Sequence, residues 1–328
     1  MENLENFHVS ATGHSLNYLP EYIAQRHGFF REQGLDVTVT VPKPWDLVLD
    51  ELASGKAAAA LGGVWVPSMY HDAPVRDYKA FAQVSNRAPL ALIGRSSSHG
   101  ASGFTLKDTI GRTVMMKGSN GASVGLFFKM LLREAGIDPR DVNYVQDLDG
   151  LMLGELFAGG MGDFLLVDNL SARALVARNP HLCVVLETVL ENKDAPWSVY
   201  YQEVAKVTPA VLDAQERFVI ALGKGMEWVL QNDAETFRDE LAEIFPAVPV
   251  DTTVELTNVF RRNGMWTSPV VSRNGYERWQ RGIADGHLVR EPLAYEKMID
   301  GRPTAAAQGK GLLISSEAEV AAKAAEAS

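Results

Sequence analysis

Short apolar runs alternate with amphipathic stretches through about the first 190 residues of the chain. The apolar runs predict strands at 8–12, 35–41, 57–62, 78–84, 88–94, 113–117, 143–146, 163–167 and 182–186. The stretches with apolar side chains at helical spacing predict helices at 17–27, 44–54, 123–135, 148–158 and 169–178. Strands that alternate with helices in this way are typical of βα units and of a largely parallel sheet.

The remainder of the chain has a different pattern. One more strand is expected at 199–203, and long helices are expected at 209–229, 234–244 and 251–263. The chain is therefore predicted to run as one βα half, a second βα half and a helical return. Residues 311–328 are expected to form a disordered tail, because Ala and Glu dominate this stretch.

Composition agrees with a folded protein of two parts. A chain of 328 residues is too long for one ordinary domain and suits two lobes. With 46% hydrophobic and 22% charged residues, each lobe can bury a core. No run of 18 apolar residues occurs, so no transmembrane helix is expected.

Charge and cysteine content exclude several function classes. The net charge of -10 argues against binding to nucleic acid or to an anionic membrane, although a local pocket for a small anion is compatible with it. The one cysteine, Cys183, lies in an apolar run and is expected to be a core residue, so no disulfide can form within the chain. The first residues are acidic and lack the pattern of a secretory signal. Either a signal was removed and the protein is periplasmic or extracellular, or it works in the cytoplasm.

The strongest local signal for chemistry is the segment 117–123, a Gly/Ser-rich turn between a predicted strand and a predicted helix. Such a turn directs free N–H groups, together with the helix dipole, at an anion. Ser119 and Ser123 add hydroxyl groups and Lys117 adds a positive charge. The spacing is neither that of a P-loop nor that of the dinucleotide fingerprint. The alternative is an ordinary turn in which Asn120 or Ser123 caps the helix.

Other predicted strand ends carry polar or aromatic residues, and ligands of open α/β sheets lie at such ends. His14, Ser15 and Asn17 follow the first strand, although His14 could equally be a solvated turn residue. Trp45 follows the second strand and could cover a ring or an alkyl group, or simply pack on its own lobe.

Further candidates follow later strands. Gly63 and Trp65 come after the third strand. Glycine there allows close approach to the backbone, which suits either a bound ligand or a tight turn. Asn86 and Arg87 lie where one lobe would lead into the other, and Arg87 could bind a carboxylate, sulfonate or phosphate or form an exposed salt bridge. Asp168 could accept from a ligand or cap the next helix.

Motifs for catalysis and for metals are weak. The chain has no Gly-x-Ser-x-Gly elbow, no His-Glu-x-x-His motif and no EF-hand loop. Its seven histidines are scattered, and no pair has the spacing of ligands on one helix. The sequence therefore predicts neither a metal site nor a cofactor.

Four segments together resemble one known family. Residues 18–37 are similar to the opening of the NMT1/THI5-like and SsuA/TauA-like family, P-x-x-x-A-x-x-x-G-[FY]-F followed by a charged pair and G-L-D-V. Residues 52–58 match its L-x-S-G-x-x-D segment, with Ala58 in place of the acid. Residues 106–114 and 131–142 resemble its later strand and helix-end segments. The resemblance extends over about residues 7–290.

The resemblance implies a type II periplasmic-binding-protein fold. This is an α/β fold of two lobes, with mainly parallel sheets flanked by helices and a ligand cleft between the lobes. Lobe 1 would comprise 1–88 plus 198–310, and lobe 2 would comprise 89–197. Carried over by position, the residues expected to line the cleft are His14, Ser15, Asn17, Trp45, Gly63, Trp65, Asn86, Ser119, Asn120, Ser123 and Asp168.

Two functions follow from the resemblance. The first is a substrate-binding protein that delivers a small anionic or polar organic solute (a sulfonate, taurine, nitrate or a pyrimidine precursor) to an ABC permease. The second is a cytoplasmic, cofactor-independent decarboxylase, hydrolase or desulfinase-like lyase, with His14 as general acid/base and Lys117 or Arg87 as electrostatic stabiliser. The chain departs from two enzyme branches: it lacks the cysteine-rich motif of the eukaryotic pyrimidine synthases and the cysteine nucleophile of the desulfinases.

Overall fold

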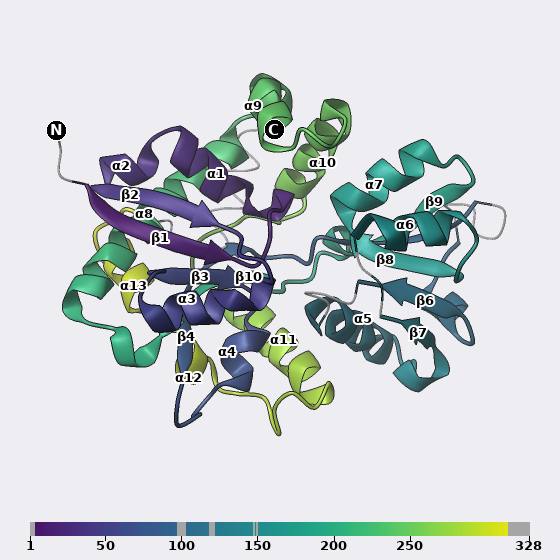
Figure 1. The fold of residues 1–328 in the computed structure, drawn as a ribbon, viewed down its shortest axis with the longest axis horizontal. Helices are drawn as coiled ribbons and strands as arrows, with labels where there is room; N and C mark the ends of the chain where they lie inside the picture. Colours follow the sequence, from purple (N-terminus) through teal and green to yellow (C-terminus); the bar gives the residue numbers. More distant parts are fainter. Residues whose placement is uncertain (1–3, 97–102, 118–121, 147, 149, 314–328) are drawn as a thin grey trace.

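The strands of the molecule form two five-stranded sheets, each flanked by helices (Figure 1). The computed structural model describes residues 4–96, 103–117, 122–146, 148 and 150–313. Sheet A has the order β2-β1-β3-β10-β4 and comprises β1 (Glu5–Ala11), β2 (Leu35–Thr40), β3 (Ala59–Gly62), β4 (Tyr78–Ser85) and β10 (Ser198–Glu203). Sheet B has the order β7-β6-β8-β5-β9 and comprises β5 (Leu90–Arg95), β6 (Thr113–Met116), β7 (Asn143–Val145), β8 (Phe164–Asp168) and β9 (Leu182–Glu187).

In each sheet one strand runs against the other four. In sheet A, β10 is antiparallel to both of its neighbours, while β1 pairs in parallel with β2 and β3. In sheet B, β5 is antiparallel to both of its neighbours, while β6 pairs in parallel with β7 and β8. Each of these two strands is the first that the chain forms after it arrives from the other sheet. The two-lobed α/β fold is therefore confirmed, with sheets that are mixed.

Helices cover both faces of each sheet. Those packed around sheet A are α1 (Leu19–Arg26), α2 (Phe29–Glu32), α3 (Val48–Ser54), α4 (Trp65–Met69), α8 (Pro209–Gln231), α12 (Tyr295–Met298) and α13 (Arg302–Gly309). Those packed around sheet B are α5 (Ala122–Glu134), α6 (Gly150–Ala158) and α7 (Asn169–Arg178). Helices α9 (Arg238–Ile244) and α10 (Val250–Arg262) pack on each other, and α10 also contacts α7.

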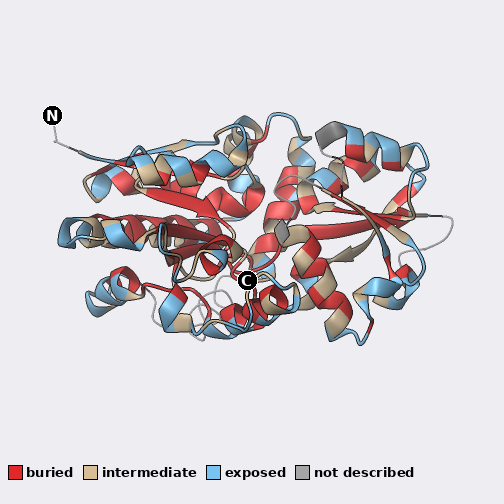
Figure 2. Ribbon diagram, turned by 60° about the horizontal axis from the view of Figure 1, so that its bottom comes forward, coloured by how far each residue is buried: buried red, intermediate tan, exposed pale blue. Residues whose placement is uncertain are grey.

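The central strands β3, β4 and β5 are buried on both faces, which is why they appear in the sequence as nearly continuous apolar runs, whereas the edge strand β2 alternates between buried and exposed residues. In β5, Leu90 and Leu92 pack on the side of α5, whereas Ala91 and Ile93 pack on the side of α6 and α7. This alternation is the two-residue period of a strand. Figure 2 shows the result, with buried strands inside and helices that are exposed only on their outer faces.

One apolar cluster joins the two sheets. Helix α11 (Arg273–Asp285) comes after the last strand of sheet A in the sequence but packs against α5, a helix of sheet B. The ring centroid of Trp279 on α11 lies 5.4 Å from that of Phe127 on α5, and 6.1 Å from that of Trp197. Buried residues of both sheets belong to this cluster, so the two halves share part of their core.

The sequence-based elements agree with the structure apart from a few differences. Helix α11 was not predicted, because its apolar positions are separated by charged residues and by two glycines. Residues 44–54 form a short 3-10 turn, Trp45–Leu47, and then α3. Of the predicted tail, residues 311–313 are described, and Leu313 packs in the core with Ala307; residues 314–328 lie outside the described part.

Candidate ligand cleft

The carboxyl ends of the mutually parallel strands of sheet A meet at one edge, where the antiparallel β10 begins. Ala11 near the end of β1 pairs with Leu61 of β3, and Gly62 pairs with Val199 at the start of β10. Ser85 at the end of β4 pairs with Ser198. The segments that follow β1, β3 and β4 therefore all begin at this edge, as the sequence predicted.

Sheet B has a corresponding edge. Met116 at the end of β6 pairs with Leu166 of β8, and Asp168 at the end of β8 pairs with Leu90. Lys117, which follows Met116, and the first turn of α7, which follows Asp168, lie at this edge. In open α/β sheets this edge is where ligands bind.

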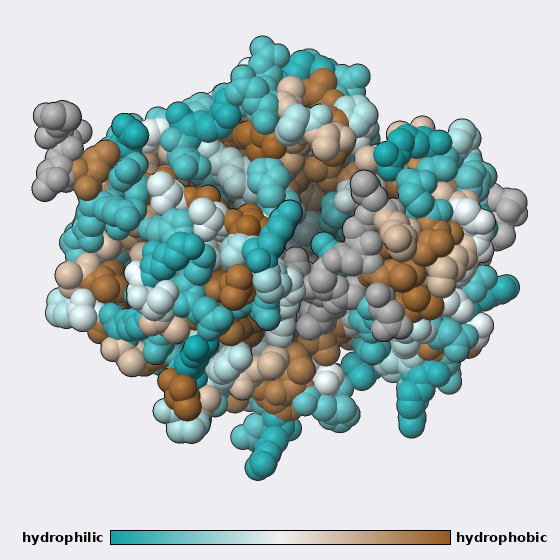
Figure 3. Space-filling model, viewed as in Figure 1, coloured by the Kyte–Doolittle hydropathy of each residue, from teal (hydrophilic) through white to brown (hydrophobic). Residues whose placement is uncertain are grey.

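Two connections bring the two edges face to face. The first runs from Ser85 to Leu90, and the second runs from Glu187 to Ser198. They lie side by side, because the N–H of Ala195 donates to the carbonyl oxygen of Asn86 over 3.0 Å. Figure 3 shows the surface hollowed between the two halves of the molecule. This hollow, between the facing edges, is the candidate cleft.

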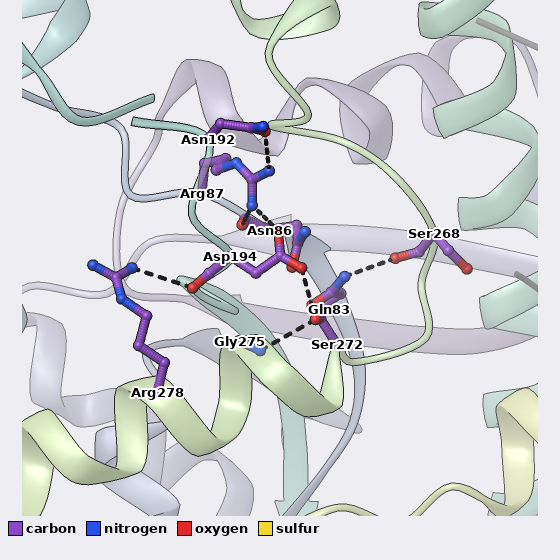
Figure 4. Close-up of polar contacts among 9 residues, drawn as sticks. All are labelled: Gln83, Asn86, Arg87, Asn192, Asp194, Ser268, Ser272, Gly275 and Arg278. Atoms are coloured by element: carbon purple, nitrogen blue, oxygen red, sulfur yellow. Dashed lines mark hydrogen bonds and ion pairs between the residues drawn. The ribbon is translucent and has the colours of Figure 1, made fainter. Parts of the chain in front are cut away.

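Arg87 lies at the connections and is already paired. Its side chain is 7% exposed and its Nη1 forms an ion pair with Asp194 of the second connection. Its Nη2 donates to Asn192 Oδ1 over 3.2 Å, as Figure 4 shows. Asp194 also accepts from the Ser272 hydroxyl over 3.0 Å. The salt-bridge alternative for Arg87 is thus the one found, although the pair is buried rather than exposed. Its charge is neutralised within the protein.

Asn86 is held by its backbone and has an unsatisfied side-chain oxygen. The residue is 2% exposed, and its N–H donates to the carbonyl oxygen of Met265 over 2.8 Å. Its Oδ1 is buried and has no hydrogen-bond partner among the described residues. A buried acceptor without a donor destabilises the fold unless a bound molecule supplies one. Asn86 is therefore the predicted site residue with the clearest unused hydrogen-bonding capacity.

Asn17 lies beneath the cleft with its hydrogen bonds already used. Its amide nitrogen donates to Ser85 Oγ over 3.1 Å and to Ser198 Oγ over 3.2 Å. Its side-chain oxygen accepts from the Ser15 hydroxyl, and its carbonyl oxygen accepts from Trp266 Nε1 over 3.0 Å. Asn17 therefore connects the segment after β1 to β4 and β10.

His14 is exposed but packed against its own lobe. Its Nε2 lies 3.0 Å from the carbonyl oxygen of Ile244 at the end of α9. Because a carbonyl oxygen can only accept, Nε2 must carry a proton in this contact. The imidazole stacks on Tyr22 at a centroid distance of 4.9 Å and lies 5.0 Å from Phe245. These contacts give His14 a role in docking α9.

Trp45 and Trp65 form an aromatic pair after β2 and β3. Their ring centroids are 6.3 Å apart in an edge-to-face arrangement, and both side chains are partly exposed. Gly63 permits this arrangement: a Cβ atom there would lie 2.5 Å from Cδ1 of Trp65. The structure thus brings together Trp45 and the stretch of Gly63 and Trp65, which the sequence predicted separately, and explains the glycine by the approach of the indole ring.

Sheet B supplies the remaining predicted residues. Lys117 and Ser123 are partly exposed, at the end of β6 and in the first turn of α5. Asp168 caps α7, since its carboxylate accepts from the N–H of Ser171 over 2.9 Å, so the capping alternative is found. Ser119 and Asn120 lie outside the described residues.

Sequence reasoning missed Asp194, which fixes the connections through Arg87. It singled out the stretches that contain Ser85 and Ser198 but did not predict their hydrogen bonds to Asn17. It also missed Gln146, whose side chain contacts Gly125 so closely that a Cβ at Gly125 would lie 2.7 Å from Nε2. Gln146 follows β7 in the same way that the predicted residues follow their strands. Its position could have been found by continuing the strand-end rule to that strand.

The structure also contains a cavity away from the cleft. It has a volume of about 360 Å³ and lies at the opposite edge of sheet A, where Lys79, Gln202 and Val204 line it. None of the helices that the structure describes is long and apolar enough to cross a membrane.

Comparisons with known proteins agree with this geometry. The chain is 26% identical over 307 residues to YtlA of Bacillus subtilis (strain 168), a protein provisionally named as a binding protein, covering 91% of this chain and 89% of YtlA. The aliphatic sulphonate-binding protein SsuA of Escherichia coli has a similar structure, with a TM-score of 0.64, 15% identity and coverage of 90% of this chain and 92% of SsuA.

Two further solved structures share the fold. The periplasmic nitrate-binding protein NrtA of Synechocystis PCC 6803 matches with a TM-score of 0.65, 13% identity and coverage of 96% of this chain and 92% of NrtA. The desulfurization enzyme DSZB matches with a TM-score of 0.60, 13% identity and coverage of 94% and 99%. The same fold thus occurs in binding proteins and in an enzyme. The family model described as NMT1/THI5 like matches residues 15–236, and the chain belongs to this family, as the sequence motifs predicted.

Proposed function

We propose that the protein is the solute-binding component of an ABC-type importer and that its solute binds between the facing edges of sheets A and B. The observation that carries the proposal is the meeting of these two edges across two adjacent connections. A cleft between two lobes can close on a small ligand by bending at such connections. Membership of the NMT1/THI5-like family supports the proposal.

The residues at the cleft favour a solute with both a polar and an apolar part. Arg87 is neutralised by Asp194, so it offers no free charge to an anion. Lys117, the Ser123 hydroxyl and backbone N–H groups at the start of α5 are then the groups proposed to bind an anionic or strongly polar head. Trp45 and Trp65 on the opposite edge would pack against an alkyl chain or a ring. A small organic sulfonate has both parts.

Isothermal titration calorimetry of the purified protein tests the proposal. The panel comprises ethanesulfonate, taurine, nitrate, a short-chain carboxylate and an aminopyrimidine. We expect stoichiometric binding of at least one of them, with the compound recovered unchanged. Absence of binding across the panel, or conversion of the bound compound, would contradict the proposal.

Two pairs of variants locate the site. Ser123→Ala and Trp45→Ala are expected to weaken binding by about tenfold each, since each removes a contact worth more than 1 kcal/mol. Ser54→Ala is the control for Ser123→Ala, because Ser54 is exposed at the far end of α3. Trp45→Phe is the control for Trp45→Ala and should retain most of the affinity. Equal affinity in all four variants would place the solute elsewhere.

A further inference from the structure

We infer that His71, Asp72 and Asp77 form a binding site for a divalent transition-metal ion of the zinc type. These residues lie in the loop that joins α4 to β4, at the lower edge of the view in Figure 1. One potential ligand atom of each residue lies within 4.8 Å of the others. This site is independent of the proposed function.

The first argument is the presence of buried polar atoms without hydrogen bonds. Both ring nitrogens of His71 are buried and make no hydrogen bond within the described part of the chain. Oδ1 of Asp77 is likewise buried and unbonded. Buried polar atoms of this kind are costly, and three of them at one place need an explanation even if each were tolerable alone. A cation would bind the lone-pair nitrogen of the neutral His71 imidazole and the Asp77 carboxylate at once.

The second argument is the geometry of the contact between His71 and Asp72. Nε2 of His71 lies 3.1 Å from Oδ2 of Asp72, yet the pair does not form a hydrogen bond. Two ligands of one zinc ion point at the metal rather than at each other and are separated by about 3.4 Å. The observed separation is close to that value.

Charge also favours a cation. The two carboxylates and one imidazole would neutralise a divalent ion when the imidazole is neutral. Arg76 lies between them in the sequence but pairs with Asp50, with both Nη atoms 3.3 Å from the same carboxylate oxygen. Imidazole with carboxylate is a ligand set for Zn²⁺ and its neighbours rather than for Ca²⁺ or Mg²⁺, which prefer oxygen alone. Three protein ligands leave a position for water, because Asp72 is exposed.

The site lies at the end of β4 that faces away from the candidate cleft. Asp77 precedes the first residue of β4, and the cleft lies at the other end of that strand. Eight residues of strand span about 26 Å. The carbonyl oxygen of Asp77 accepts from the N–H of Val204 over 2.8 Å, so this ligand is fixed to the strand end of β10. A bound ion would thus stabilise the loop that follows α4, the helix that begins with Trp65.

Calorimetric titration of the tag-free, chelator-treated protein with Zn²⁺ tests the inference. We expect one equivalent to bind, with at least a tenfold loss of affinity in His71→Gln and in Asp77→Asn. His8→Gln is the matched control: both ring nitrogens of His8 already have threonine partners, at 2.8 and 3.0 Å. Unchanged affinity in His71→Gln, or absence of Zn²⁺ binding to the parent protein, would overturn the inference.

A second measurement covers the case in which a buried variant fails to fold. Asp72→Asn alters only the exposed ligand and should leave the fold intact while weakening Zn²⁺ binding. X-ray absorption of the zinc-loaded parent protein should show one imidazole and oxygen ligands. The same measurement on Asp72→Asn and Asp77→Asn is the control. An unchanged set of zinc ligands in both variants would place the ion at another site. Mg²⁺ should not compete with Zn²⁺.

Discussion

At the scale of the residue, Glu21 is the most unusual ionisable group of the fold. Its side chain on α1 is fully buried, Oε2 accepts from the Tyr200 hydroxyl over 2.6 Å, and Oε1 has no partner among the described residues. Burial raises the pKa of this carboxyl group from 4.5 to about 7, and the Tyr200 hydrogen bond only partly opposes the rise. The folded protein therefore retains a proton that the unfolded chain loses at lower pH.

The sign of the resulting pH dependence follows from this difference. The stabilisation is complete below the unfolded pKa of 4.5 and is lost as pH rises to about 7. The difference between the folded and unfolded pKa corresponds to about 3 kcal/mol in the free energy of unfolding. We expect Glu21→Gln to lose less stability between pH 5 and pH 8 than the parent protein in thermal unfolding. The control is Glu155→Gln, on the exposed face of α6, whose stability should change with pH as that of the parent does. The same pH dependence in Glu21→Gln as in the parent would show that the Glu21 carboxyl is not the cause.

A second prediction at this scale concerns Gly63. In Gly63→Ala the new methyl group would overlap the Trp65 ring, so the ring must move. We expect a destabilisation of about 1–3 kcal/mol and a shifted tryptophan emission. Gly13→Ala is the control, because no atom lies within 4 Å of a Cβ at Gly13. Identical spectra for the two variants would show that Trp65 does not occupy the position described.

The residues also show how far the sequence can predict a site. The strand-end rule correctly placed Trp45, Gly63 and Trp65 near one edge, because the order of the elements decides which segments begin there. It offered a salt bridge for Arg87 but could not identify Asp194 as the partner, since Asp194 is 107 positions away in the sequence. Partners at such separations depend on the two connections lying side by side, which no local pattern specifies.

At the scale of the element, the two connections are held together by Arg87 and Asp194. The Arg87 side chain is 7% exposed and the Asp194 side chain is 22% exposed, so either charge alone would be poorly solvated. We expect Asp194→Asn and Arg87→Met each to destabilise the protein by about 3 kcal/mol. The double variant should be less destabilised than the sum of the two, which chemical denaturation can measure. Additive losses would show that the ion pair does not couple the connections.

The helices and strands were predicted well where the spacing of their apolar residues was regular. The strands and the helices α5 and α8 carry continuous apolar patterns and were found within a few residues. Helix α11 was missed although Tyr276, Trp279 and Ile283 are spaced as on one helix face and Ser272 caps its start. Its low overall hydropathy concealed this pattern. The helix buries its apolar side against α5, a contact that only the three-dimensional arrangement supplies.

At the scale of the whole molecule, the shared cluster between α5 and α11 has a thermodynamic consequence. Arg278 of α11 is bound to Glu134 of α5 by two contacts of 2.7 and 2.8 Å, and the apolar rings beside it are buried in common. The unfolding of either half would expose part of the core of the other. We expect a single calorimetric transition with equal calorimetric and van't Hoff enthalpies. Two resolved transitions would show that the halves unfold independently.

The paired connections also restrict how the two halves can move. Besides the bond between Ala195 and Asn86, the N–H of Trp197 donates to the carbonyl oxygen of Ser85 over 3.1 Å, so the second connection is bonded to the first at two places. Bending at these adjacent connections is the motion that would open or close the cleft. Helix α11 also links the two halves through its contact with α5, so the same motion must shift or break that contact. The contact between α5 and α11 thus limits how far the two sheets can separate.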